Sequence, residues 1–85
     1  MEPFNLLALK KFCADIIENE KWGPEVTIVL LDLGMNPMYE MTARKDGDVY
    51  VFENERLVPG TVQRPRPYTV RFIVSGKPIL RDFPG

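Results

Sequence analysis

The sequence predicts an α+β fold in which one N-terminal helix packs on a curled antiparallel sheet of four to five strands. Three observations lead to it: apolar residues at helical spacing near the amino terminus, an Asp46-Gly47 turn between two strand-like segments, and an alternating segment that begins at Tyr68. Packing the helix on one face of the sheet hides the apolar sides of both elements. A small five-stranded barrel plugged by the helix is the alternative.

The first expected element is a helix over residues 5–20. Asn5 or Glu2 can cap the free amide groups of its first turn, and Gly23-Pro24 stops it because proline cannot continue the hydrogen-bond ladder. Its apolar residues recur every three or four positions and therefore share one stripe. They are Leu6, Leu9, Phe12, Cys13, Ile16 and Ile17.

Strands are expected in the rest of the chain. Residues 25–33 form a near-continuous apolar run that begins with β-branched residues, which predicts a strand covered on both faces. Residues 38–44 and 48–53 form the arms of a hairpin around Asp46-Gly47, where glycine accepts the positive φ of a tight turn. Residues 57–67 contain three prolines and no periodicity, which indicates a loop. Residues 68–75 alternate as a half-buried strand does, and residues 79–83 offer a short last strand.

Size and composition indicate one soluble domain over residues 1–85. The single cysteine cannot form an internal disulfide, which fits a reducing compartment. The amino terminus lacks the pattern of a signal peptide or a membrane span, so we expect a cytoplasmic protein with no membrane partner.

The net charge of −1 conceals an uneven distribution of charge along the chain: ten acids and five bases up to residue 54, then two acids and six bases. The favoured interpretation is that these charges pair across the fold; the alternative is a partner-facing side.

The chain lacks most of the residues that carry catalysis. It contains no histidine, which removes the commonest general base and metal ligand. Cys13 falls on the apolar stripe of the helix, where a buried structural role is expected. Asp46 and Asp48 bracket a glycine, but a calcium loop needs ligands spread over about twelve residues. We therefore expect no catalytic residue, no metal site, no cofactor and no enzymatic activity.

The most distinctive segment covers residues 63–72 and reads QRPRPYTVRF. In a structural interpretation, its prolines hold an extended connection and its arginines keep that connection soluble. In a second interpretation it belongs to a protein-docking surface, since Arg and Tyr are enriched at interface hot spots and a stiff loop loses little entropy on binding. The candidate contacts on that surface are Trp22, Arg64, Arg66, Tyr68 and Arg71.

A third interpretation is contact with nucleic acid. A basic strip with one aromatic residue for base stacking would consist of Arg64, Arg66, Arg71, Lys77, Arg81 and Tyr68. A general nucleic-acid binder is normally much more basic than this chain, whose isoelectric point is near 5.4. Protein docking therefore ranks above nucleic-acid binding.

The favoured function is a non-enzymatic binding module that docks on another protein. Its small size and lack of catalytic groups resemble the inhibitors and adaptors among phage or mobile-element accessory proteins, by analogy of composition alone. One alternative is a nucleic-acid-binding protein that uses the arginine-rich C-terminal half. Another is a structural or assembly protein, with a homodimer formed through the sheet edge that the short last strand leaves open.

Overall fold

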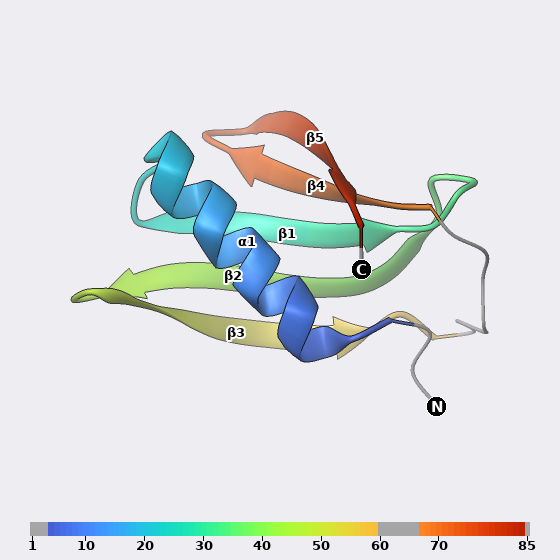
Figure 1. Ribbon diagram of the computed structural model, residues 1–85, viewed down its shortest axis with the longest axis horizontal. Helices are drawn as coiled ribbons and strands as arrows, with labels where there is room; N and C mark the ends of the chain where they lie inside the picture. Colours follow the sequence, from blue (N-terminus) through green and yellow to red (C-terminus); the bar gives the residue numbers. More distant parts are fainter. Residues whose placement is uncertain (1–3, 60–66, 85) are drawn as a thin grey trace.

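The computed structural model describes residues 4–59 and 67–84 and shows one helix lying across one face of a five-stranded sheet (Figure 1). Neighbouring strands are antiparallel, and their order across the sheet is β3-β2-β1-β4-β5. The sheet is open, so the α+β prediction is confirmed and the barrel alternative is wrong. The elements are α1 (Leu6–Glu20), β1 (Glu25–Leu31), β2 (Pro37–Asp46), β3 (Val49–Leu57), β4 (Tyr68–Val74) and β5 (Lys77–Phe83).

The helix α1 begins and ends where its capping groups are. The Asn5 side-chain oxygen accepts a hydrogen bond from the Ala8 amide at 3.0 Å, so Asn5 is the N-cap and the helix starts one residue later than expected. At the other end, Lys21 has a φ of 55° and its amide donates to the Ile17 carbonyl. Within residues 4–59 and 67–84, no helix has both the length and the apolar character needed to cross a membrane.

The core lies between α1 and the sheet. The helix contributes its apolar stripe, and each strand contributes alternate residues, because successive side chains of a strand point to opposite faces. Phe12 of α1 lies against Phe83 of β5, with ring centroids 5.2 Å apart. The residues buried at the centre of this layer are Leu9, Cys13, Ile17, Val26, Ile28, Leu30, Met41, Ala43, Val70 and Phe72.

Several strand boundaries differ from those expected. The hairpin arms extend to Asp46 and Leu57, and β3 accommodates an extra residue beside Asn54, whose φ is 56°. The last strand starts at Lys77, because β5 pairs with β4 along its full length. The first strand stops early, at Leu31, because the Asp32 carboxylate accepts a hydrogen bond from the Asn36 amide at 2.9 Å and closes a turn.

The two faces of β1 have different surroundings. Val26, Ile28 and Leu30 face the helix, whereas Val29 and Leu31 point to the opposite face and are also buried. Burial on both faces is therefore confirmed at these positions, although α1 covers only one of them (Figure 1). No helix or strand among the described residues covers the far face of the sheet.

Both edges of the sheet carry features that discourage pairing with another strand. The β3 edge contains the bulge at Asn54 among charged neighbours. The β5 edge contains Pro78, which lacks an amide donor, and the Arg81 guanidinium donates to the Leu80 carbonyl at 3.0 Å. Prolines, bulges and charges at edges are devices that block edge-to-edge association. These features disfavour the alternative in which a homodimer forms through a sheet edge.

Candidate docking surface

The structure separates the residues predicted to form the docking surface. Arg64 and Arg66 lie outside the described residues. Trp22 and Tyr68 lie on the helix side of the sheet, whereas Arg71 lies on the opposite side. The three described contacts therefore do not lie on one face of the sheet.

Trp22 packs against the core at the end of α1. Its ring is half-buried, and its centroid lies 5.1 Å from that of Phe72 with an interplanar angle of 56°. The Arg81 guanidinium lies over the indole at 5.5 Å and also approaches Glu20, with an N–O distance of 3.8 Å. Through these contacts Trp22 shields one end of the core from solvent.

Tyr68 is corrected from a surface contact to a core residue. Only 2% of it is exposed, and it pairs across the strands with Phe83, which is also buried. Its place in the chain explains this, since Tyr68, Val70 and Phe72 alternate along β4 and all point toward the helix. A partner cannot reach the Tyr68 ring without displacing the core.

Arg71 occupies what we call the uncovered sheet face, formed by the strand residues that point away from α1. It lies between Val29 of β1 and Leu80 of β5 in the strand register. The side chain is half-buried, and its Nε atom is buried without a hydrogen-bond acceptor. Buried polar groups are nearly always hydrogen-bonded, so an unpaired guanidinium nitrogen calls for an explanation.

The β2–β3 half of the same face carries two internal ion pairs. Arg44 and Glu53 form a two-bond contact at 3.0 and 3.3 Å. This hydrogen bonding raises the pKa of Arg44 and lowers the pKa of Glu53. Arg56 donates to Glu40 at 3.0 and 3.2 Å. Among the described arginines, Arg71 alone thus makes neither an ion pair nor a hydrogen bond to a carboxylate.

The β4–β5 half surrounds Arg71 with apolar residues and one acid. Leu80, directly opposite Arg71, is 48% exposed, and Ile73 and Pro78 form the neighbouring pair. Asp82 lies opposite Thr69 on the same face, is exposed, and makes no ion pair within the described part of the chain. Sequence reasoning missed Leu80 and Asp82, because only the β4–β5 register places them beside Arg71.

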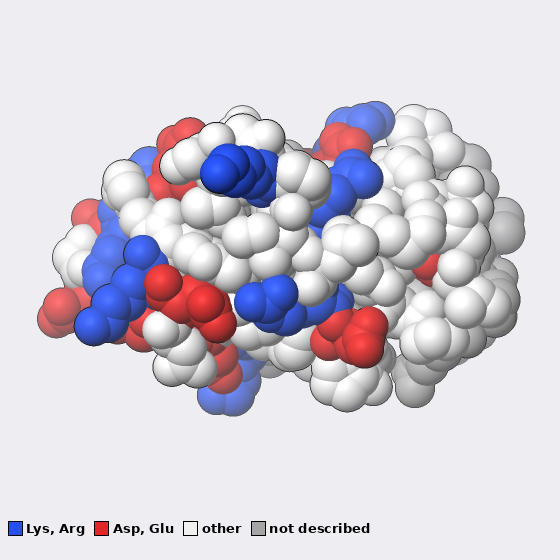
Figure 2. Space-filling model, turned by 90° about the horizontal axis from the view of Figure 1, so that it is seen from above, with Lys and Arg blue, Asp and Glu red and all other residues white. Residues whose placement is uncertain are grey.

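The described basic residues do not form one continuous strip. Arg71 and Arg81 lie on opposite faces of the sheet, since Arg81 pairs across the strands with buried Val70. On the side shown in Figure 2, Lys and Arg side chains are interspersed with those of Asp and Glu. Arg56 and Arg81 contact acids from the first part of the chain, which confirms in part that the sequence asymmetry pairs across the fold.

At the end of the molecule that carries the β1–β2 turn, on the right in Figure 2, the described residues in view are almost all uncharged. Leu33 and Met35 in this turn are 57% and 46% exposed. The turn is held by hydrogen bonds between Asp32 and Asn36, including one from the Asp32 amide to the Asn36 carbonyl at 3.0 Å. It therefore presents two apolar side chains on a hydrogen-bonded turn.

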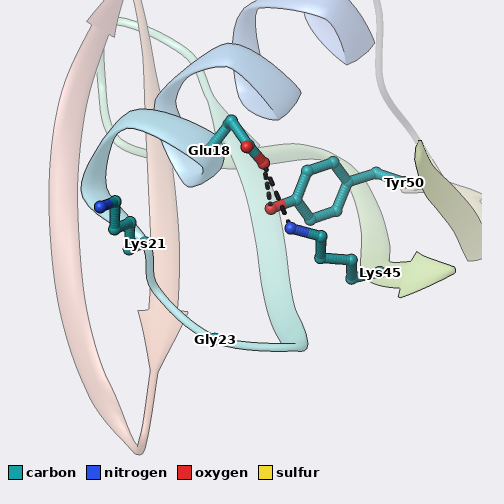
Figure 3. A pocket seen from close by; sticks show the side chains of 5 residues that line it. All are labelled: Glu18, Lys21, Gly23, Lys45 and Tyr50. Carbon is teal, nitrogen blue, oxygen red and sulfur yellow. Dashed lines mark hydrogen bonds and ion pairs between the residues drawn. The ribbon is translucent and has the colours of Figure 1, made fainter. Parts of the chain in front are cut away.

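The helix side of the molecule has shallow hollows, and in one of them the lining side chains contact one another. Figure 3 shows one of about 270 Å³ between the end of α1 and the β2–β3 hairpin. Across it, the Tyr50 hydroxyl donates to Glu18 at 3.2 Å, and the Lys45 amine lies 3.6 Å from the same carboxylate. Desolvation, followed by the bond to Glu18, raises the pKa of Tyr50. Glu18, Tyr50 and Lys45 thus already contact one another across this hollow.

A metal site is equally unsupported in residues 4–59 and 67–84, where no three Cys, Asp or Glu side chains are grouped to hold an ion. Within the described ranges, the buried side-chain polar atom left without a hydrogen-bond partner is Nε of Arg71, on the uncovered sheet face. In comparisons with known proteins, no family model, no curated protein and no solved structure matches this chain.

Proposed function

We propose that this protein is a non-enzymatic docking module that binds another protein through the uncovered sheet face, as an inhibitor or an adaptor does. One observation carries the proposal: Arg71 is half-buried on that face, and its Nε has no acceptor. A buried polar group left unpaired costs about 1–3 kcal/mol. Because Nε itself is closed to solvent, a carboxylate from a partner would pair with the outer nitrogens of the same guanidinium through charge-assisted hydrogen bonds.

The surroundings of Arg71 support this role. Leu80 and Ile73 give an apolar centre, and the Arg44–Glu53 pair on the other half of the sheet gives a polar margin. Interfaces that bind specifically combine an apolar core with a polar rim, and arginine is enriched among their energetic centres. The face is built on paired strands, so binding there orders little additional backbone.

The test is affinity capture from a native lysate with matched variants. Arg71→Glu reverses the unpaired charge, whereas Lys77→Glu makes the same change at an exposed lysine that has no ion pair within the described residues and lies in the β4–β5 turn region. We expect specific partners to be lost with Arg71→Glu and retained with Lys77→Glu. Circular dichroism checks that both variants fold.

A third variant tests the competing surface at the β1–β2 turn. Leu33→Ser/Met35→Ser removes both exposed apolar side chains of that turn without touching the sheet. Loss of partners with this variant, together with their retention by Arg71→Glu, would contradict docking through the uncovered sheet face. Identical partners for all variants and the wild type would contradict it as well.

A further inference from the structure

We propose that the occupant of the uncovered sheet face is a second copy of this chain, forming a two-fold dimer in which two sheets pack face to face. The inference rests on the docking role proposed for this face and assigns it a second copy in place of a foreign partner. Stacked sheets lie about 10 Å apart with their strands within about 30° of each other. Such an arrangement leaves the protected sheet edges unused, in agreement with the features at Pro78 and Asn54.

The charges of this face are self-complementary. In a two-fold interface, a residue that contacts a second residue in the other copy is matched by the reciprocal contact. The β4–β5 half offers one unpaired cation, Arg71, and one unpaired anion, Asp82, on adjacent strands. Each copy therefore supplies one Arg71 and one Asp82, and two copies facing each other can form two equivalent Arg71–Asp82 ion pairs.

A simple symmetry operation brings these charges together. The strand register pairs Arg71 with Leu80 and Thr69 with Asp82. We place a two-fold axis in the plane midway between the two sheets, perpendicular to the strands and halfway between these two residue pairs. Rotation about this axis lays each strand of the second copy over the same strand of the first. Arg71 then lies over Thr69 of the second copy and one strand away from its Asp82. An arginine and an aspartate together span the gap of about 10 Å between the sheets.

The dimensions of the molecule allow an interface of at most standard size on this face, where Val29 and Leu31 are already buried. The two longer extents of the molecule, 35 and 23 Å, run in the plane of Figure 1 and limit the face to roughly 800 Å² per copy. A standard protein interface buries about this area on each partner. The Arg44–Glu53 pair lies on the same face but away from the axis, where a charged pair suits the rim.

Charge exchange tests the dimer directly, with the purified chain as its own probe. Sedimentation equilibrium is measured from about 5 to about 500 µM, a range that spans weak to moderately tight dissociation constants. We expect the wild type to move from 9.8 kDa toward twice that mass as its concentration rises. Arg71→Glu and Asp82→Arg should each remain monomeric, and Arg71→Glu/Asp82→Arg should form the dimer again. Lys77→Glu, the control, should behave as the wild type does.

The possible outcomes separate this inference from the function on which it rests. A wild type that stays monomeric throughout, single variants that still form dimers, or a double variant that does not recover would each overturn the dimer. If a reversed charge prevents folding, Leu80→Lys places an unpaired charge at an exposed position on the same face, and a retained dimer would overturn it too. A monomeric wild type whose lysate partners are lost with Arg71→Glu would leave the docking proposal in place with a different occupant.

Discussion

Trp22 and Phe72 pack ring against ring, with centroids 5.1 Å apart, where the end of α1 meets β4. Aromatic pairs at this separation contribute about 0.5–1.5 kcal/mol beyond the area that they bury. Trp22 also joins the core layer as a partly buried residue. The indole therefore has a structural role, and its packing accounts for its position without a contact to a partner.

Replacing Trp22 should destabilise the protein. Fully buried aromatic residues cost about 3–5 kcal/mol when changed to alanine, so for the half-buried Trp22→Ala we expect a loss of about 2 kcal/mol in the free energy of unfolding. Urea denaturation followed by circular dichroism measures it. Leu7→Ala is the control, because Leu7 is 79% exposed and should change stability by less than about 0.5 kcal/mol. Equal stability of Trp22→Ala and the wild type would show that the indole does not hold the core.

The sequence carried enough information for the fold but not for the surface. The three- and four-residue spacing of Leu9, Cys13 and Ile17 identified the helix and its buried stripe, because periodicity follows directly from helix geometry. The two-residue period of β4 also separates two of the predicted contacts. Tyr68 and Arg71 are three positions apart, so their side chains must point to opposite faces.

The neighbours of Arg71 were beyond the reach of local patterns. Asp82 and Leu80 lie beside it only because β4 and β5 pair in one register, and a shift of one residue would turn both to the helix side. The order of the strands was equally hidden, since β4 pairs with β1 rather than with β3, the strand before it in the chain. Long-range pairing of this kind depends on the packing of the whole sheet.

Cys13 should be unreactive in the folded protein. It is fully buried within the helix stripe, and desolvation raises the pKa of its thiol to about 12, so almost no thiolate exists near neutral pH. We expect slow modification by a disulfide reagent at pH 8 in buffer and rapid modification in concentrated urea. Absorbance of the released thiolate measures both rates. Rapid reaction of the folded chain would contradict the burial of Cys13.

Glu55 links β3 to the helix and to β2. Its carboxylate lies 2.8 Å from the Lys10 amine and accepts a hydrogen bond from the Tyr39 hydroxyl at 2.5 Å. The bond from Lys10, followed by that from Tyr39, lowers the pKa of Glu55 below its ordinary value. A carboxylate whose pKa is lower in the folded state than in the unfolded state stabilises the fold above its unfolded pKa. That stabilisation disappears as the pH falls through the folded pKa.

The pH dependence of Glu55→Gln should therefore differ from that of the wild type. At pH 7 the variant lacks the charged contacts and should have the lower free energy of unfolding. As the pH falls through the lowered pKa of Glu55, the wild-type carboxylate becomes protonated and the difference should shrink. Urea denaturation at several pH values measures this difference. In a Lys10→Met background, which removes the main cause of the lowered pKa, the difference at pH 7 should be smaller. A difference that stays constant from pH 7 to pH 3 would show that the Glu55 charge contributes nothing to the stability of the fold.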